Sequence, residues 1–185
     1  MSKEFTYTFR AIWFIVRTIL ILAVVALLAL FCFRTAQQLS GIYVIVTEGM
    51  ETRANVVMHK KETNEMVEYF STQFIQDDPL LSEKKYADYY ITNFNYMMRV
   101  KSINVLPWSK SASVVLEDRV TGIFGGLSDT AKAALQTDEQ EPPMPQWVNC
   151  RYKINLIKDD ANRWYISDIQ TEQVLVEEKE TNTQP

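Results

Sequence analysis

Residues 11–33 read AIWFIVRTILILAVVALLALFCF, a run that is apolar except for Arg17 and Thr18. As an α-helix, a run of about 23 residues rises roughly 34 Å, which is enough to cross the roughly 30 Å hydrocarbon core of a bilayer. A cleaved secretory signal has a shorter apolar core and small residues at its cleavage site, whereas this run ends in bulky side chains before Arg34. The sequence therefore predicts a retained transmembrane helix over 11–33.

The positive charges around this run predict its orientation. Lys3, Arg10 and Arg17 lie on or near its amino-terminal side, while Arg34 is the only basic residue on the other side before Arg53. Loops with an excess of Lys and Arg stay in the cytoplasm. We therefore expect a single-pass protein of the cell membrane, with residues 1–10 in the cytoplasm and the chain beyond the helix outside it.

Arg17 lies inside the predicted membrane segment and has two interpretations. A charge one or two turns inside the bilayer costs up to a few kcal/mol, and a long side chain that points back to the headgroups recovers much of this cost. In the first interpretation Arg17 reaches the headgroups in this way. In the second, Arg17 pairs with an acidic residue on a neighbouring transmembrane helix.

The chain beyond the membrane segment is acidic and has the size of one domain. Of the 23 acidic residues only Glu4 lies before residue 34, whereas four of the 19 basic residues lie at or before it, so 22 acids and 15 bases remain. An acidic domain gains nothing from phosphate backbones, which argues against nucleic-acid binding. About 150 residues suffice for one hydrophobic core. The two cysteines cannot form a disulfide within one chain, because Cys32 lies in the membrane segment and Cys150 on a predicted strand.

Apolar residues recur at helical spacing after the membrane segment. This pattern predicts that the membrane helix continues as a helical stalk over 34–61, with Gly49 as a weak point because glycine costs about 1 kcal/mol in a helix. A second helix is predicted over 63–76 and ends before Pro79, because the residue before a proline avoids the α region. A third helix is predicted over 83–93. The extracytoplasmic domain is expected to occupy 62–176, followed by a disordered acidic tail over 177–185.

From residue 96 onward the pattern changes to the alternation that is typical of strands. Alternating runs predict one strand over 96–106, a second that begins near Ala112, a third over 147–158 and a fourth over 163–171. A loop-like insert with a short helix over 128–135 is expected between Gly125 and Gln146. The residues Asp159-Asp160-Ala161-Asn162 supply turn chemistry between the last two strands.

Helices followed by a meander of strands predict an α+β domain in which helices pack on one face of a curved antiparallel sheet. The ending 152–169, which reads YKINL, an acidic turn and then RWYISDI, resembles the closing hairpin of nuclear transport factor 2-like domains. A membrane helix followed by such a domain is also similar in layout to the assembly proteins of conjugation channels in type IV secretion systems. The resemblance implies a cone-shaped fold whose enzymes work from inside the cone.

No residue pattern in the sequence predicts catalysis. The sole histidine, His59, precedes the predicted domain within the charged run HKKE, which is typical of a solvated helix end. Without a second histidine, a zinc site is not expected and a Ser-His-Asp triad lacks a well-placed base. We therefore expect a protein that is not an enzyme, with no catalytic residues, no metal site and no cofactor.

Aromatic residues gather in the predicted domain and have two interpretations. The first is a filled core. The second is a concave pocket lined by Tyr89, Tyr90 and Trp164, with Asp168 as an inward polar group on the face of Trp164, because apolar walls with few polar groups are typical of ligand sites. An acid–base pair of Asp168 with either tyrosine is the one arrangement that catalysis could use.

These observations favour a non-enzymatic membrane protein whose extracytoplasmic domain makes protein–protein contacts. Its expected partners are the lipid bilayer and either other envelope proteins or further copies of itself, as in a scaffold subunit of a transfer or secretion channel. The alternative is a small-ligand-binding or sensory module that uses the aromatic pocket.

Overall fold

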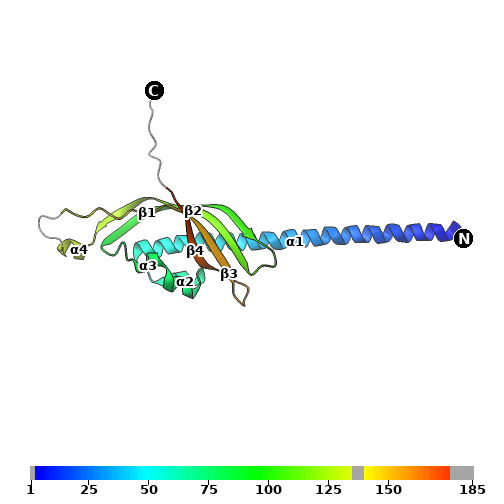
Figure 1. Cartoon of the computed structure of the whole chain (residues 1–185), viewed down its shortest axis with the longest axis horizontal. Coiled ribbons are helices and arrows are strands. Elements are labelled where there is room, and N and C mark those ends of the chain that lie inside the picture. Colours follow the sequence, from blue (N-terminus) through cyan, green and yellow to red (C-terminus); the bar gives the residue numbers. More distant parts are fainter. Residues whose placement is uncertain (1–2, 135–139, 176–185) are drawn as a thin grey trace, which may run out of the picture.

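The computed structural model describes residues 3–134 and 140–175, and its longest element is helix α1, which runs from Lys3 to His59. The amino-terminal part of α1 projects far beyond the rest of the chain (Figure 1). All side chains from Ile12 to Arg34 are exposed. This part of α1 is long and apolar enough to span a membrane. The predicted tail over 177–185 lies outside the described residues.

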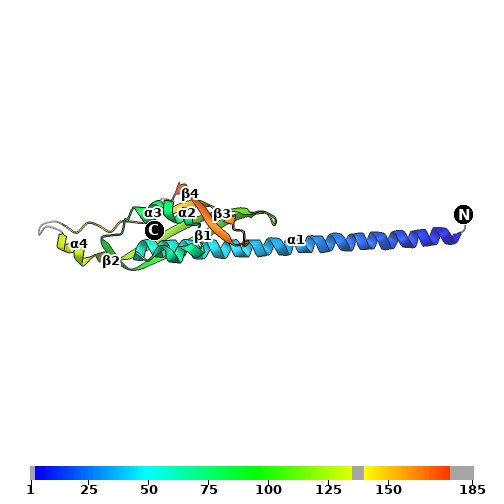
Figure 2. The same ribbon diagram turned by 90° about the horizontal axis from the view of Figure 1, so that it is seen from below.

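The carboxyl-terminal part of α1 belongs to the domain core. Ile42, Val46 and Met50 are each at most 1% exposed and pack against the sheet. The segment expected as a stalk is therefore helical but lies against the sheet (Figure 2). Gly49 does not interrupt the helix: a Cβ atom there would lie 3.0 Å from Cβ of Tyr69, so the glycine allows a close approach of this neighbouring segment.

The sheet consists of four antiparallel strands in the order β1-β2-β3-β4. The strands are β1 (Tyr89–Val105), β2 (Ser111–Leu127), β3 (Cys150–Lys158) and β4 (Trp164–Val174). Within the described chain the sheet is open, with β1 and β4 as its edges. The predicted α+β class, with one long amino-terminal helix and an antiparallel sheet, is confirmed.

One face of the sheet packs on α1 and forms a continuous core with it. The alternation of β2 and β3 places apolar side chains on this face and mostly polar ones on the other, where Val115 and Ile157 are exceptions. The most deeply buried members of the face are Val114, Leu116, Ile154, Leu156 and Ile166. The aromatic residues contribute to this core through Phe70, Tyr152 and Trp164.

The predicted helix over 63–76 is divided in two by a contact with β4. The chain forms a 3-10 helix, η1 (Thr63–Glu68), and a separate short helix, α2 (Thr72–Asp77). Between them the N–H of Ile166 donates to the carbonyl of Tyr69 at 2.8 Å, and the N–H of Ser71 donates to the carbonyl of Ile166 at 2.9 Å. Backbone groups used in this way cannot continue a helix.

The predicted helix over 83–93 is wrong. Helix α3 (Pro79–Ser82) ends before it, and β1 begins at Tyr89. Tyr89 and Ile91 pair with Leu127 and Gly125 of β2, so strand pairing overrides the local helical pattern.

Strand β2 is longer than predicted and contains Gly125 and Gly126, which were expected to open the insert. The insert therefore begins after Leu127, with helix α4 (Asp129–Ala134) inside the predicted helical range of 128–135. The closing β3–β4 hairpin is confirmed, although β3 begins at Cys150 and not at Trp147.

Candidate functional site

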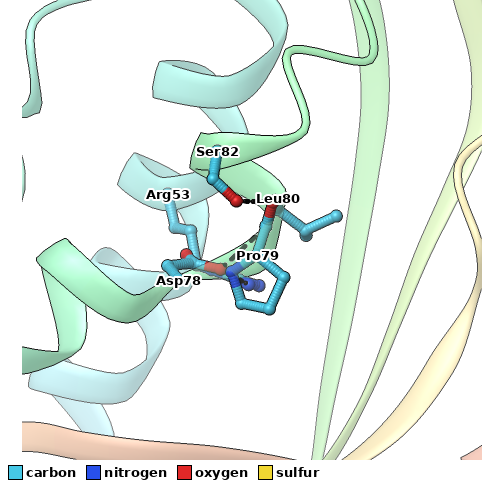
Figure 3. A network of polar contacts seen from close by, with 5 residues as sticks. All are labelled: Arg53, Asp78, Pro79, Leu80 and Ser82. Atoms are coloured by element: carbon cyan, nitrogen blue, oxygen red, sulfur yellow. Dashed lines mark hydrogen bonds and ion pairs between the residues drawn. The ribbon is translucent and has the colours of Figure 1, made fainter.

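The interior of the domain holds a bidentate ion pair. Arg53 on α1 donates from Nε to Oδ2 of Asp78 at 2.6 Å and from Nη2 to Oδ1 at 2.7 Å (Figure 3). Only 5% of Arg53 and 1% of Asp78 are exposed. Asp78 also accepts a hydrogen bond from the N–H of Leu80 at 3.1 Å and so caps α3. The pair ties α1 to the segment that leads into the sheet.

Asp118 is a second buried acid, on the core-facing side of β2. Oδ1 accepts from the N–H of Cys150 at 3.2 Å, and Oδ2 accepts from Nε1 of Trp147 at 3.3 Å. Burial raises the pKa of Asp118 to about 6, although these hydrogen bonds and the charge of Arg53 act in the opposite direction. Asp118 therefore titrates in a pH range where ordinary aspartates are fully ionised.

Phenol and thiol groups lie near Asp118. Burial raises the pKa of Tyr96, Tyr152 and Cys150, which keeps all three protonated at neutral pH. A protonated buried thiol is a poor nucleophile. Within the described chain, Nη1 of Arg53 and the hydroxyl of Tyr96 are buried without a hydrogen-bond partner. The cluster can donate hydrogen bonds but offers no activated nucleophile.

The outer face of the sheet carries a second charged cluster, centred on Glu117. Its carboxylate lies 2.6 Å from Nη2 of Arg151 and 3.1 Å from Nζ of Lys101. The hydrogen bonds from Arg151 and Lys101 lower the pKa of Glu117. Because the two cations compensate this carboxylate, the cluster is a structural cross-strand network.

The structure does not gather the four predicted pocket residues into one site. Tyr89 pairs with Leu127 at the end of β2, and its hydroxyl donates to the carbonyl of Pro143 at 3.1 Å. Tyr90, on the opposite side of the strand, is 51% exposed. Trp164 lies at the other end of the sheet, where its Nε1 donates to Oε1 of Gln38 on α1 at 3.0 Å.

Asp168 does not share a face with Trp164, contrary to the prediction. The pairing of β3 with β4 shifts by one residue between Asn155 and Leu156, so Ser167 is an extra residue in β4. Such a bulge reverses the alternation, and Ile169 packs on the core in place of Asp168. Asp168 instead accepts a hydrogen bond from Nδ2 of Asn155 at 3.1 Å on the outer face. An acid–base pair of Asp168 with Tyr89 or Tyr90 has no geometric basis.

Two cavities open at the end of the domain away from the apolar amino-terminal part of α1. The larger, about 760 Å³, lies between residues 120–123 of β2 and residues 144–149. The smaller, about 300 Å³, is lined by apolar side chains and by four lysines, which are Lys60, Lys61, Lys84 and Lys85. Neither cavity is lined by Tyr89, Tyr90, Trp164 or Asp168.

Arg17 and His59 both lie on α1. Arg17 is exposed on α1, about one helical turn from Trp13. His59 is exposed at the end of α1, with its ring 5.4 Å from that of Phe94. Within residues 3–134 and 140–175, no three His, Cys, Asp or Glu side chains are arranged to hold a metal ion.

Neither buried acid was predicted from the sequence. A signal for Asp118 was present, because it lies in step with Val114, Leu116 and Val120 on the inward side of an alternating strand. A carboxylate in such a row is expected to be buried. Asp78 gave no comparable signal, because an aspartate directly before a proline is equally typical of a solvated helix start.

In comparisons with known proteins, no family model, curated protein or solved structure matches this chain.

Proposed function

We propose that this chain is a non-enzymatic single-pass membrane protein whose extracytoplasmic domain makes protein–protein contacts, as a scaffold subunit of an envelope assembly such as a transfer or secretion channel. The observation that carries this proposal is the larger cavity, which runs beside a strand edge of β2. The contact expected there is an extended segment of another protein that pairs with this edge.

Within the described residues, β2 has two neighbouring strands over only part of its length, and this leaves an open edge. Strand β3 pairs with β2 from Ser111 to Asp118, whereas β1 continues to pair with it as far as Leu127. The N–H of Val120 donates to Oδ1 of Asn149 at 2.9 Å, so the open part begins at Thr121. An unpaired edge offers backbone donors and acceptors to an added strand.

Exposed apolar side chains surround the larger cavity beside the open edge of β2, which we call the groove. Phe124 is 59% exposed, Val148 50% and Val174 54%. Such side chains around a concave surface are typical of a protein-binding site. An extended partner segment would cover them while its backbone pairs with β2.

Helix α1 holds the groove at a set height above the membrane. His59 lies 26 residues beyond Phe33 on the same unbroken helix, which corresponds to about 39 Å along the axis. The core contacts of Ile42, Val46 and Met50 fix the domain on this helix. A scaffold subunit needs this kind of rigid link between its anchor and its contact surface.

We also propose that the domain has the nuclear transport factor 2-like fold. Two features support this fold: a helix that lies across one face of an antiparallel sheet, and the closing β3–β4 hairpin. A catalytic role has little support, because the buried cluster offers protonated phenols and a protonated thiol and His59 lies outside it.

Site-specific photo-crosslinking in native membranes tests the proposed contact. A benzophenone side chain is introduced at Ile123 or Val148 in the groove, and at Val67 as a matched control, because Val67 is 54% exposed on η1. We expect discrete protein adducts from the two groove positions and none from residue 67. An adduct at twice the mass of the chain identifies self-association, and another mass identifies a different protein. Equal crosslinking at all three positions, or none, would contradict the proposal.

A second candidate function, small-ligand binding, is favoured by the smaller cavity. Its lysines surround Val56, Leu80 and the buried Tyr86, whose hydroxyl has no hydrogen-bond partner within the described residues. Lys60 and Lys84 have φ angles of 53° and 46°, a conformation that non-glycine residues adopt at a cost. These features suit an anion with a short apolar chain.

Thermal denaturation with and without octanoate tests this function, because a ligand that binds the folded state raises the midpoint temperature of unfolding. An unchanged midpoint, or the same increase in Lys84→Gln, would argue against it.

A further inference from the structure

The turn between β1 and β2 exposes an apolar tip that the proposed function does not use. Leu106 is 52% exposed and Trp108 is 72% exposed. The N–H of Ser109 donates to the carbonyl of Leu106 at 2.9 Å, which closes a tight turn with Pro107 at its second position. The tip is therefore an ordered turn whose large apolar side chains face solvent.

The tip lies beside the membrane segment of α1. The ring centroids of Trp108 and Phe31 are 6.1 Å apart, with an angle of 50° between the ring planes. Phe31 is three residues before Arg34, where the apolar run ends. Trp108 stays mostly exposed in spite of this contact, so Phe31 covers only a small part of its ring.

The position of Phe31 along α1 sets the depth of the tip. Phe31 lies 18 positions after Trp13, the tryptophan near the other end of the apolar run, which corresponds to about 27 Å along the helix. This length is close to the roughly 30 Å thickness of a hydrocarbon core. Tryptophan prefers the two membrane–water interfaces, where its ring is in the apolar region and its N–H reaches water. If Trp13 marks one interface, Phe31 and Trp108 lie at the level of the other.

We propose that the Leu106–Trp108 tip inserts into the interfacial region of the bilayer leaflet on the domain side and forms a second membrane contact beside α1. This proposal rests on the proposed membrane span, since the tip has an apolar environment only if α1 crosses the bilayer. The occupant of the exposed surface is lipid, because the tip continues the apolar surface of α1 at its boundary with Arg34.

A second contact restricts how the domain moves. A domain on a single helix can tilt with that helix in the bilayer. With the tip in the interface, the end of the domain that carries the β1–β2 turn stays at the membrane surface. The groove near residue 123 then keeps one orientation as well as one height.

Site-directed spin labelling of the full chain in phosphatidylcholine–phosphatidylglycerol nanodiscs tests this proposal. Cys32→Ser and Cys150→Ala remove the native thiols, and a nitroxide is attached at Lys110→Cys, two residues from Trp108. Collision with oxygen reports proximity to the bilayer interior, and collision with a polar nickel chelate reports water. Labels at Leu20→Cys and Val67→Cys provide the membrane and aqueous references, because both native side chains are exposed on the protein.

We expect the oxygen-to-nickel collision ratio at residue 110 to lie between those of residues 20 and 67. Adding Leu106→Ser and Trp108→Ser should lower this ratio to the value of residue 67. A ratio at residue 110 equal to that at 67 with the native tip would overturn the tip contact while the label at residue 20 still reports a membrane span. An interfacial ratio that survives both serine substitutions would also overturn it. If residue 20 itself is accessible to nickel, the membrane span fails, and the tip contact fails with it.

Discussion

Arg53 and Asp78 form a two-bond ion pair inside the domain, with donor–acceptor distances of 2.6 and 2.7 Å. The pair joins α1 to the N-cap residue of α3, 25 residues later in the chain. Both charges are removed from water, so the stability of the fold depends on keeping them together.

Asp78→Asn should therefore destabilise the domain strongly. The amide can still cap Leu80, but it leaves the buried Arg53 guanidinium without a counter-charge, which typically costs about 3–5 kcal/mol. Urea unfolding of the full chain in detergent, followed by near-ultraviolet circular dichroism, measures this loss. The double variant Arg53→Met/Asp78→Asn is the control and should recover part of the stability. If Asp78→Asn unfolds at the same urea concentration as the native chain, the ion pair has no stabilising role.

Gly49 and Gly41 offer a matched comparison on α1. Replacing a helical glycine with alanine gains up to about 1 kcal/mol from helix propensity. At Gly41 the new Cβ would be 3.9 Å from Trp164, an ordinary contact, so Gly41→Ala should be stabilising. At Gly49 it would lie 3.0 Å from Cβ of Tyr69 and 3.1 Å from Cδ1 of Ile166. Overpacking of this kind costs about 1–3 kcal/mol, so Gly49→Ala should have no net gain or a loss. Equal shifts in the urea midpoint for the two variants would contradict the close packing of η1 on α1.

Asp118 should make the domain less stable as the pH rises from about 4 to about 6. Its pKa is about 6 in the folded chain, against a usual value of 3.8, so the folded state binds more protons than the unfolded state in this window. The contribution of Asp118 to the free energy of unfolding is therefore largest below the window and falls through it. One pKa unit corresponds to about 1.4 kcal/mol, which makes the full change on the order of 3 kcal/mol.

Asp118→Asn tests this pH dependence because the amide does not titrate. The unfolding free energy of the native chain minus that of the variant should be more positive at pH 4 than at pH 7. Urea titrations of both proteins at these two pH values give the difference. A constant difference would show that Asp118 has an ordinary pKa in the folded chain.

The proposed orientation predicts where the end of the chain lies. A reporter that is active only outside the cytoplasm, fused after Pro185, should give signal, and one that is active only inside should give none. Changing Lys3 and Arg10 to glutamate should reduce this asymmetry, since the basic residues set the orientation. The reverse reporter pattern in the native chain would contradict both the orientation and the envelope-scaffold proposal.

Local patterns in the sequence were sufficient for several elements. The apolar run over 11–33 predicts a membrane helix because its length and hydrophobicity need no contact with the rest of the chain. The last two strands and their turn were also predictable, since alternation and the Asp159–Asn162 turn act within one hairpin. In each case the physical cause lies within neighbouring residues.

Contacts between distant residues decided the remainder. The segment over 83–93 has a helical pattern, but β2 provides a strand partner from Tyr89 onward. The bulge at Ser167 turned Asp168 away from the face of Trp164, and a bulge depends on the register of the partner strand. The Arg53–Asp78 ion pair also depends on the tertiary structure, because the sequence does not specify which acidic residue lies beside Arg53.

The sequence by itself determined that one apolar helix leads into an α+β domain, because hydrophobic length and periodicity are properties of single segments. Only the tertiary structure decided that α1 continues into the domain core, that Trp108 lies beside Phe31 and that β2 leaves an edge open from Thr121 onward within the described residues. Each of these features depends on the relative placement of segments that are far apart in the chain. Burial, strand register and close packing set that placement, and local preferences do not.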